Sequence, residues 1–182
     1  MNRCRWVNLN NPLYIRYHDL EWGIPLHDDS ALYELLILET FQAGLSWECV
    51  LNKREAFRLA FDGFDPQKVA SYGEEKLEAM MQNPGIIRNR RKLLAAVKNS
   101  KVFLEIQAEF GSFDRYLQSF TGGKTYFEAY TLRTTSPLSD RISADLKRRG
   151  MTFVGSTILY SFLQSCGVIH AHGKECDKYR EK

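Results

Sequence analysis

Apolar residues recur at helical spacing through most of this 182-residue chain, and this pattern limits the folds open to it. The helical blocks cover residues 29–61, 66–81, 89–110, 143–150 and 156–167. No segment sustains the alternation of apolar and polar residues that is typical of a β-strand. Helix breakers separate the blocks, at Gly63 and Pro66, Pro84 and Gly85, Gly122 and Gly123, and Gly150. Asp65 and Pro66 read as an N-cap and first helical residue. The pattern predicts an all-α bundle.

Composition is consistent with one compact domain, because a chain with 44% hydrophobic and 26% charged residues can bury a core unaided. The start of the chain has no apolar stretch after its basic residues, and the longest aliphatic run, "LLIL", is too short for a bilayer. We therefore expect neither a signal peptide nor a membrane span. Four cysteines without disulfide-scaffold spacing favour a reducing cytoplasm. A net charge of +3 permits an anionic partner without demanding one.

Cysteine and histidine residues near both ends of the chain suggest a metal site. His172 and Cys176 are four residues apart, which places both side chains on one face of a helix or tight turn. Cys4 and His18 are a second pair near the other end, and together the four would make a closed tetrahedral set. His170 is a rival donor. Spacing alone leaves open that the cysteines pack in the core and the histidines face water, since the pattern matches no common zinc finger.

A carboxylate in an apolar helix is the strongest sign of a binding pocket. Glu39 lies within the run "LYELLILETF", which is apolar almost all round and therefore predicted to be buried. A buried carboxylate either takes up a proton at a raised pKa or needs a cation or several donors. Aromatic residues flank this run: Trp6, Tyr14, Tyr17, Trp22 and Trp47. Most aromatics are core residues, but an aromatic cage around a carboxylate suits a flat cationic ligand.

The segment 143–166 predicts two helices joined by a short apolar turn. The first helix stops at Gly150 and the second begins around Gly155 to Thr157, where unpaired N–H groups can bind a phosphate oxygen. An ordinary αα-hairpin fits the same pattern. Basic residues offer phosphate contacts or a solvated helix face: Arg88, Arg90, Arg91, Lys92, Lys147, Arg148 and Arg149.

Six motifs, in order along the whole chain, carry a specific resemblance: "RCRW", "YHDLEWG", "LETFQAGLSW", "GIIRNRRK", "KRRGMTFVGSTILYSFLQSCG" and "HGKEC". Together they resemble the bacterial 3-methyladenine DNA glycosylase I family. The resemblance implies an all-α helix-hairpin-helix glycosylase fold with one structural Zn²⁺ per chain. It implies as the zinc ligands Cys4, His18, His172 and Cys176. The single domain of 1–182 would then comprise a bundle over 26–166 and a zinc-stapled terminal subdomain of 1–25 plus 167–182. The chain ends in "DKYREK", without the extra cysteines of some relatives.

The resemblance also implies an activity and its site. The family hydrolyses the N-glycosidic bond of 3-methyladenine in alkylated double-stranded DNA, releasing the free base and leaving an abasic site, and we expect a monomer. The base pocket would contain Glu39, Tyr17 and Trp47, with Trp6, Tyr14 and Trp22 nearby. Gly44 and Leu45 are expected to fill the gap left by the flipped nucleotide. Gly155, Ser156 and Thr157 are expected to contact the DNA backbone.

The expected chemistry is mild because N3-alkylated adenine is cationic and departs as a neutral base. Relatives that also cut the strand place a lysine just after the hairpin, where this chain has Ser156 and Thr157, so a monofunctional enzyme is predicted. The superfamily's catalytic aspartate has no counterpart, because Glu175 and Asp177 flank an expected zinc ligand. Glu39 is either a general base or a recognition group, and its aromatic surroundings favour recognition.

Two other functions would explain parts of the sequence. A non-catalytic DNA-binding module would explain the basic runs and the metal, but not a carboxylate in an apolar helix flanked by tryptophans. A helical enzyme that uses zinc catalytically on a small molecule is disfavoured, because four protein ligands leave no open coordination position.

Overall fold

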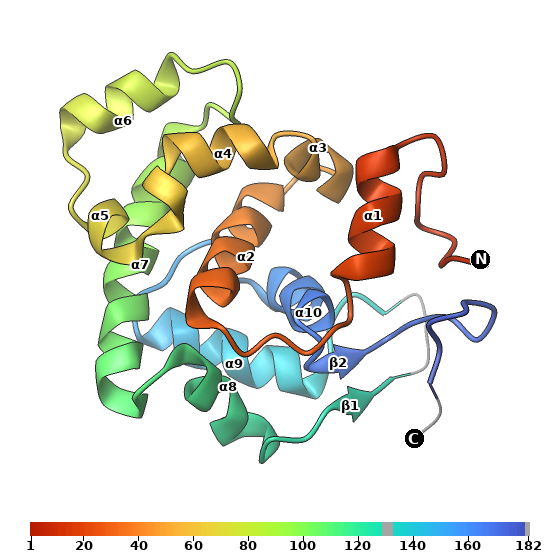
Figure 1. Ribbon diagram of the computed structural model, residues 1–182. Helices are drawn as coiled ribbons and strands as arrows, with labels where there is room; N and C mark the ends of the chain where they lie inside the picture. The colour runs from red at the N-terminus through yellow and green to blue at the C-terminus, as the bar shows by residue number, and fades with distance from the viewer. Residues whose placement is uncertain (129–132, 181–182) are drawn as a thin grey trace.

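The computed structural model describes residues 1–128 and 133–180, which are mostly helical, as the sequence predicts (Figure 1). The helices are α1 (Pro12–Leu20), α2 (Asp29–Gln42), α3 (Trp47–Leu51), α4 (Arg54–Ala60), α5 (Pro66–Ala70), α6 (Glu74–Met81), α7 (Arg90–Phe110), α8 (Phe113–Thr121), α9 (Pro137–Arg148) and α10 (Ser156–Ser165), with a 3₁₀ turn η1 (Asp62–Phe64). No helix among these described residues is long and apolar enough to cross a bilayer.

A short parallel strand pair joins the otherwise helical elements. β1 (Tyr126–Phe127) pairs with β2 (Ile169–His170), so that Tyr126 lies opposite Ile169. The sequence did not predict these strands, because two residues are too few to show alternation. The pairing fixes the chain just before the metal-ligand candidates near the C-terminus.

The helical block expected over 29–61 divides into three helices. α2 ends at Gln42, and Gly44 then adopts a left-handed conformation with φ +78°, which no helix can continue through. Ser46 starts α3 by accepting a hydrogen bond from the N–H of Cys49. Asp65 caps α5 with Pro66 at its first position, as expected. The residues between α2 and α3, 43–46, form an exposed turn that we call the α2–α3 loop.

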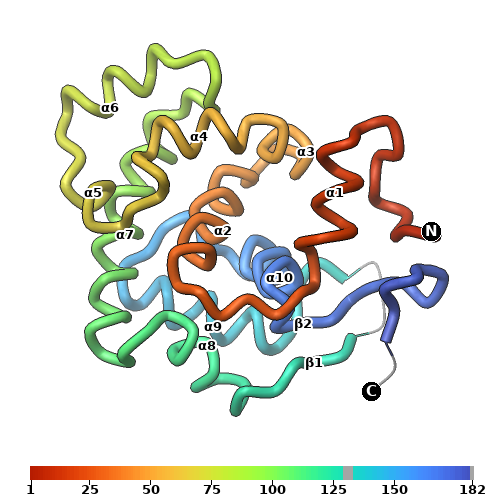
Figure 2. The backbone as a smooth tube through the Cα atoms, viewed as in Figure 1, coloured from red at the N-terminus to blue at the C-terminus, as the bar shows by residue number. Residues whose placement is uncertain are grey.

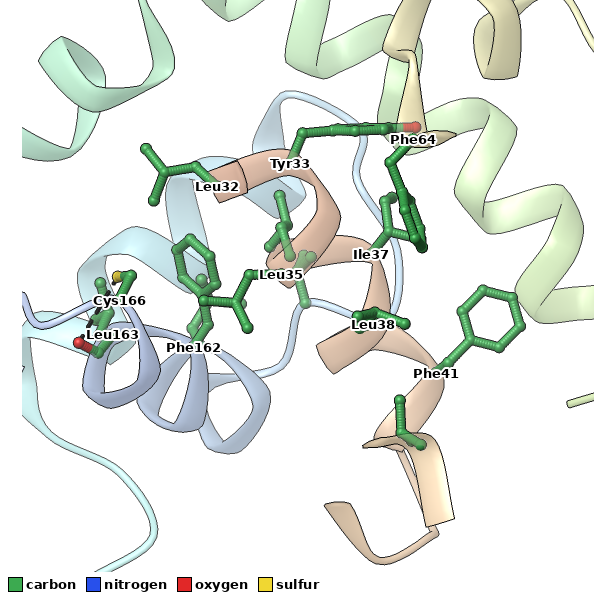
Figure 3. Close-up of a cluster of buried hydrophobic side chains, with 14 of the residues drawn as sticks. Leu32, Tyr33, Leu35, Ile37, Leu38, Phe41, Phe64, Phe162, Leu163 and Cys166 are labelled. Carbon is green, nitrogen blue, oxygen red and sulfur yellow. Dashed lines mark hydrogen bonds between the residues drawn. The ribbon is translucent and has the colours of Figure 1, made fainter. Parts of the chain in front are cut away.

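The centre of the core is α2, which neighbouring helices cover on several sides (Figure 3). Its side chains at Leu32, Tyr33, Ile37 and Phe41 are fully buried. Phe162 of α10 packs in the same cluster. Burial on several faces explains why α2 is apolar almost all round, since each buried Leu, Ile or Phe contributes about 1.5–3 kcal/mol. A polar residue within this helix is therefore buried as well.

The two ends of the described chain lie on the same side of the molecule (Figure 2). The N–H of Asp177 donates to the carbonyl of Asn2 at 3.0 Å, and the N–H of Asn2 donates to the Asp177 carboxylate at 2.9 Å. The N–H groups of Gly23 and Leu26 reach carbonyls at the end of α10. These bonds bring the N-terminal aromatic residues against α10. Positions 181–182 of the expected terminal subdomain lie outside the described residues.

Candidate functional site

One cavity of about 150 Å³ collects the residues expected around a base pocket. The aromatic and acidic residues that line it are Trp6, Tyr14, Tyr17, Trp22, Glu39 and Trp47. They come from the N-terminal segment, α1, the turn after α1, α2 and α3. Four further polar residues complete the lining: Gln42, Ser161, Gln164 and Ser165. The cavity thus lies where α1, α2, α3 and α10 meet.

Glu39 is buried in the cavity wall, with 1% of its surface exposed. Its Oε1 accepts a hydrogen bond from the Ser165 hydroxyl at 3.1 Å, and its Oε2 has no partner among the described residues. Burial raises the pKa of Glu39 to about 8, and the hydrogen bond from Ser165 opposes that rise. The carboxyl group is therefore mostly protonated near neutral pH, and a nearby cation would shift it toward the charged form.

Tyr17 joins Glu39 through the same serine. The Tyr17 hydroxyl donates to Ser165 Oγ at 2.9 Å. Burial raises the pKa of Tyr17 well above its usual value, so the hydroxyl stays a donor. Ser165 Oγ also lies 2.9 Å from the carbonyl of Ser161, so its single hydrogen is shared between two acceptors. The Tyr17 ring lies 5.3 Å from the Trp47 ring, which completes an aromatic wall beside the carboxylate.

Three buried polar atoms of the described residues have no hydrogen-bond partner, and all three belong to residues that line this cavity. They are Oε2 of Glu39, Oε1 of Gln42 and Nε1 of Trp47. A buried polar atom left unpaired costs about 1–3 kcal/mol, so native proteins rarely tolerate several together. These carboxyl, amide and indole groups, set among aromatic rings, are suited to a flat ligand that carries both donors and acceptors.

The remaining aromatic residues connect this cavity to the cysteine and histidine residues. The Trp6 ring lies 5.3 Å from Tyr14 and 4.9 Å from Trp22. On its other side Trp22 lies 4.6 Å from the His172 ring, with the rings nearly perpendicular. Trp6 packs against His18 at 5.4 Å. The cavity wall therefore rests on the histidines near the two ends of the chain.

Cys4, His18, His172 and Cys176 form a buried cluster that could hold a metal ion, with all ligand atoms within 4.8 Å of one another. Cys4 Sγ lies 3.5 Å from His172 Nδ1, and Cys176 Sγ lies 3.5 Å from His18 Nε2 and 3.4 Å from His172 Nδ1. In a tetrahedral zinc site, bond lengths of about 2.3 Å to sulfur and about 2.0 Å to nitrogen put the two atoms about 3.5 Å apart. The donor set and its separations therefore fit Zn²⁺.

Neighbouring groups orient the two histidines of the cluster. His18 Nδ1 lies 2.8 Å from the Asp19 carboxylate, which leaves Nε2 with a lone pair toward the cluster. The Arg3 guanidinium binds Asp19 at 2.7 Å and lowers its pKa to about 2, with help from His18. Burial lowers the pKa of His172 to about 4, so this ring stays neutral and able to bind a metal. Burial also raises the pKa of the Cys4 thiol to about 12, which a metal cation would reverse.

His170 does not belong to the cluster. Its Nε2 accepts a hydrogen bond from the N–H of Arg180 at 3.1 Å, and its ring packs against Phe127 and His172. His172 rather than His170 has its ring nitrogen beside the cysteines, with Nδ1 at 3.5 Å from Cys4 Sγ and 3.4 Å from Cys176 Sγ.

The residues expected to contact DNA lie in the exposed turn between α2 and α3 and at the N-terminus of α10. In the α2–α3 loop the Leu45 side chain is 42% exposed, and a Cβ at Gly44 would meet nothing within 4 Å. α9 and α10 are joined by residues 149–155, which we call the α9–α10 loop. Gly155 is the N-cap of α10, the Ser156 hydroxyl donates to Asp140 at 2.5 Å, and Thr157 is exposed. α9 ends at Arg148 with Arg149 as its C-cap, and Gly150 follows with φ +107°, so the helix stops at the glycine as expected.

Several basic residues proposed as phosphate contacts have other partners. The prediction for Lys92 is wrong, because its ammonium is buried and donates to backbone carbonyls of Phe41 and Ala43. Other members form ion pairs: Arg90 with Glu74 and Glu78, Arg148 with Asp145, and Arg149 with Asp145 and Glu109. Arg88, Arg91 and Lys147 are exposed.

Four lining residues were missed by the sequence analysis. Gln42 follows Glu39 by three residues on the same face of α2. Ser161, Gln164 and Ser165 occupy positions i, i+3 and i+4 of α10, an otherwise apolar helix. Like Glu39, these are polar residues within an apolar helix, and that pattern is the signal that marks them.

Comparison with known proteins gives one consistent result. The family model for methyladenine glycosylase matches residues 6–180. The chain is 44% identical to DNA-3-methyladenine glycosylase 1 of Escherichia coli, over 98% of this chain and 97% of that protein. It is 42% identical to DNA-3-methyladenine glycosylase of Haemophilus influenzae, over 96% of each. A crystal structure of a tyrosine-to-phenylalanine variant of 3-methyladenine DNA glycosylase I, in complex with 3-methyladenine, superimposes with a TM-score of 0.93 at 37% identity and full coverage of both chains.

Proposed function

The chain belongs to the methyladenine glycosylase family, and we propose that it is a base-excision DNA glycosylase that removes 3-methyladenine from alkylated DNA. The observation that carries this proposal is the aromatic cavity with its three unpaired buried atoms, on Glu39, Gln42 and Trp47. A purine ring offers the flat shape and the mixed donors and acceptors that such a cavity would satisfy.

The substrate carries its own activation. N3-alkylation makes adenine cationic, so cleavage of the N-glycosidic bond releases a neutral base without strong acid catalysis. Undamaged adenine would have to leave as an anion. We propose that the protein flips the alkylated nucleotide into the cavity, holds the base there, and lets water attack the sugar.

Glu39 acts in this proposal as a recognition group. A cationic base beside its unpaired Oε2 favours the carboxylate form, which burial otherwise disfavours. Ser165 holds Oε1, Tyr17 holds Ser165, and the rings of Tyr17 and Trp47 enclose the base from the side. A neutral purine would interact less favourably with the buried carboxylate and would offset less of its desolvation free energy. Selectivity for alkylated bases follows from that difference.

The proposed metal is one structural Zn²⁺ per chain, bound by Cys4, His18, His172 and Cys176. Four protein ligands close the tetrahedron, so the ion would supply stability rather than an activated water. By this proposal residues 1–25 and 167–182 form a terminal subdomain that packs on the bundle of 26–166. The cysteines form no disulfides among the described residues, which fits a reducing cytoplasm.

The proposed DNA-binding elements are the α2–α3 loop and the α9–α10 loop with the first turn of α10. α9, the α9–α10 loop and α10 would act as a helix-hairpin-helix, with the free N–H groups after Gly155 binding a phosphate without regard to sequence. Leu45 and Gly44 would fill the gap left by the flipped nucleotide. Ser156 and Thr157 offer no amine to attack the sugar, so we propose a monofunctional enzyme that leaves the strand intact and works as a monomer.

One experiment tests the function directly. The protein is incubated with methylated duplex DNA, and the released bases are separated by chromatography while strand integrity is followed on a gel. We expect 3-methyladenine in solution and abasic sites that break only after alkali. Binding without base release would favour a non-catalytic DNA-binding module. A covalent adduct trapped with borohydride would disprove the monofunctional assignment.

A further inference from the structure

Two buried polar side chains of α7 each bind the backbone at a different loop, one at the α2–α3 loop and one at the α9–α10 loop. The Lys92 ammonium donates to the carbonyl of Phe41 at 2.7 Å and to that of Ala43 at 2.6 Å. The Asn99 amide donates to the carbonyl of Thr152 at 2.9 Å and accepts from the Thr152 N–H at 2.9 Å. Neither side chain lines the base cavity. Both are 5% exposed or less.

Lys92 closes the C-terminal end of α2. The last carbonyls of a helix lack intrahelical partners. Here the N–H of Leu45 donates a hydrogen bond to the Gln42 carbonyl at 2.7 Å. The Lys92 ammonium donates to the carbonyls of the two neighbouring residues, Phe41 and Ala43. The negative end of the helix dipole also favours a cation at this position. Burying an ammonium group is costly unless hydrogen bonds compensate it. Because the buried Lys92 ammonium depends on these two carbonyls, it holds the backbone of Phe41 and Ala43 in place. The α2–α3 loop, with Gly44 and Leu45, starts from that position.

Asn99, two turns further along α7, holds the α9–α10 loop. Its reciprocal pair of hydrogen bonds fixes both polar backbone groups of Thr152, a residue whose side chain is exposed. Ser143 of α9 adds a bond from its hydroxyl to the Val154 carbonyl at 2.7 Å. In Figure 1 the connection from α9 to α10 passes beside α7. The loop that precedes the N-terminus of α10 is thus tied to α7 as well as to α9.

The positions of Lys92 and Asn99 on α7 give these contacts a common geometry. They are seven residues apart, so they lie two turns from each other on the same face, about 10 Å apart along the axis. A helix of 21 residues is a stiff element, and the bonds at both positions are to backbone, not to flexible side chains. The separation of the two loops is therefore fixed by α7.

From this geometry we infer that Lys92 and Asn99 are positioning residues that set the spacing between the α2–α3 loop and the α9–α10 loop. The inference rests on the proposed function, in which one loop fills the gap in the duplex while the other holds a backbone phosphate. Both contacts must be made by the same DNA molecule at the same time. If the distance between the loops is fixed, the second loop is already placed to contact the DNA once the first has bound, so less conformational entropy is lost.

The test compares binding of the free base with binding of DNA. The variants are Lys92→Met, Asn99→Ala and the double variant, and the control is Lys101→Met, which removes the same charge from an exposed position of α7. Free 3-methyladenine is titrated by tryptophan fluorescence. A duplex with a tetrahydrofuran abasic analogue measures DNA binding, and 2-aminopurine opposite the analogue reports insertion of the α2–α3 loop.

We expect each single variant to bind the free base like the wild type but to bind the abasic duplex roughly tenfold more weakly, with a reduced 2-aminopurine signal. The Lys101→Met control should bind both the free base and the abasic duplex like the wild type. Losing either contact already leaves the distance between the two loops unconstrained. The double variant should therefore lose little more affinity for the abasic duplex than one single variant. Independent stabilising residues would instead give additive losses.

Three outcomes would overturn the inference: unchanged DNA binding in both single variants, equal losses for base and DNA, or additive losses in the double variant. If Lys92→Met does not fold, Asn99→Ala carries the same comparison from the other loop. Failure of the proposed function is a separate result, because it appears as absence of base release by the wild type. The abasic duplex needs no catalysis.

Discussion

The Ser165 hydroxyl donates to the Glu39 carboxylate across 126 positions of sequence, at 3.1 Å, and this bond ties α10 to α2 at the cavity. The second oxygen of Glu39, Oε2, has no partner within residues 1–128 and 133–180. Glu39 is therefore held in place by one oxygen while the other is available to a ligand.

Replacing Ser165 by Ala removes the donor that opposes the raised pKa of Glu39, so that pKa should rise further. We expect affinity for free 3-methyladenine to fall by about 0.5–1.5 kcal/mol, with a parallel loss of excision. Fluorescence titration measures the affinity. Ser119→Ala, which loses a hydroxyl bonded to a backbone carbonyl of α8, should leave it unchanged.

Glu39→Gln decides between recognition and general-base catalysis. The variant keeps the shape of the side chain but loses the charge, and we expect it to fold and to bind undamaged DNA as before. Affinity for free 3-methyladenine should fall by about 1.5–3 kcal/mol, the cost of a charge-assisted hydrogen bond. A general base would behave differently: excision would collapse while titration with the free base gave the wild-type affinity.

Stability should depend on pH through Glu39. The pKa of Glu39 is about 8 in the folded protein against an ordinary value of 4.5, so between these limits the folded state binds more protons than the unfolded state. The free energy of unfolding contributed by this group therefore falls as pH rises through that window. Glu39→Gln lacks the effect. Urea unfolding of both proteins at about pH 5 and about pH 8 should show the variant gaining on the wild type at the higher pH.

Cys176→Ser should remove the zinc and lower stability by several kcal/mol, because metal binding and folding are coupled. Metal analysis of protein purified without chelator should give one zinc per wild-type chain. Cys49→Ser is the matched control, since Cys49 lies outside the cluster and should change neither zinc content nor base affinity. A wild-type preparation that is folded and active without zinc would contradict the assignment.

Leu45→Ala tests the α2–α3 loop. The side chain is exposed, so we expect the melting temperature to stay nearly unchanged. Binding of a duplex with an abasic analogue and excision from DNA should both weaken, because less apolar surface fills the gap. Titration with the free base provides the internal comparison and should match the wild type. Equal affinity of Leu45→Ala and wild type for the abasic duplex would remove this residue from the DNA-binding surface.

Helical periodicity predicted the fold class, and the polar residue within α2 predicted where a cavity would be. The same rule was not applied to α10, so Ser165 was missed although it bonds Glu39 directly. Lys92 was misassigned because a basic run suggests a solvated face, and only the packing of α7 against the end of α2 reveals that one of its members is buried. The two-residue strands depend on tertiary pairing and leave no local pattern.

The aromatic wall of the cavity rests on residues from the far end of the chain, since Trp22 packs on His172 and Asn2 is bonded to Asp177. During synthesis the ribosome releases the first of these residues long before the second. Trp22 therefore lacks its contact with His172 until nearly the whole polypeptide has been synthesised. A nascent chain halted short of His172 would contain every residue that lines the cavity but would lack the ring on which Trp22 packs, so the support of the aromatic wall is synthesised after the wall itself.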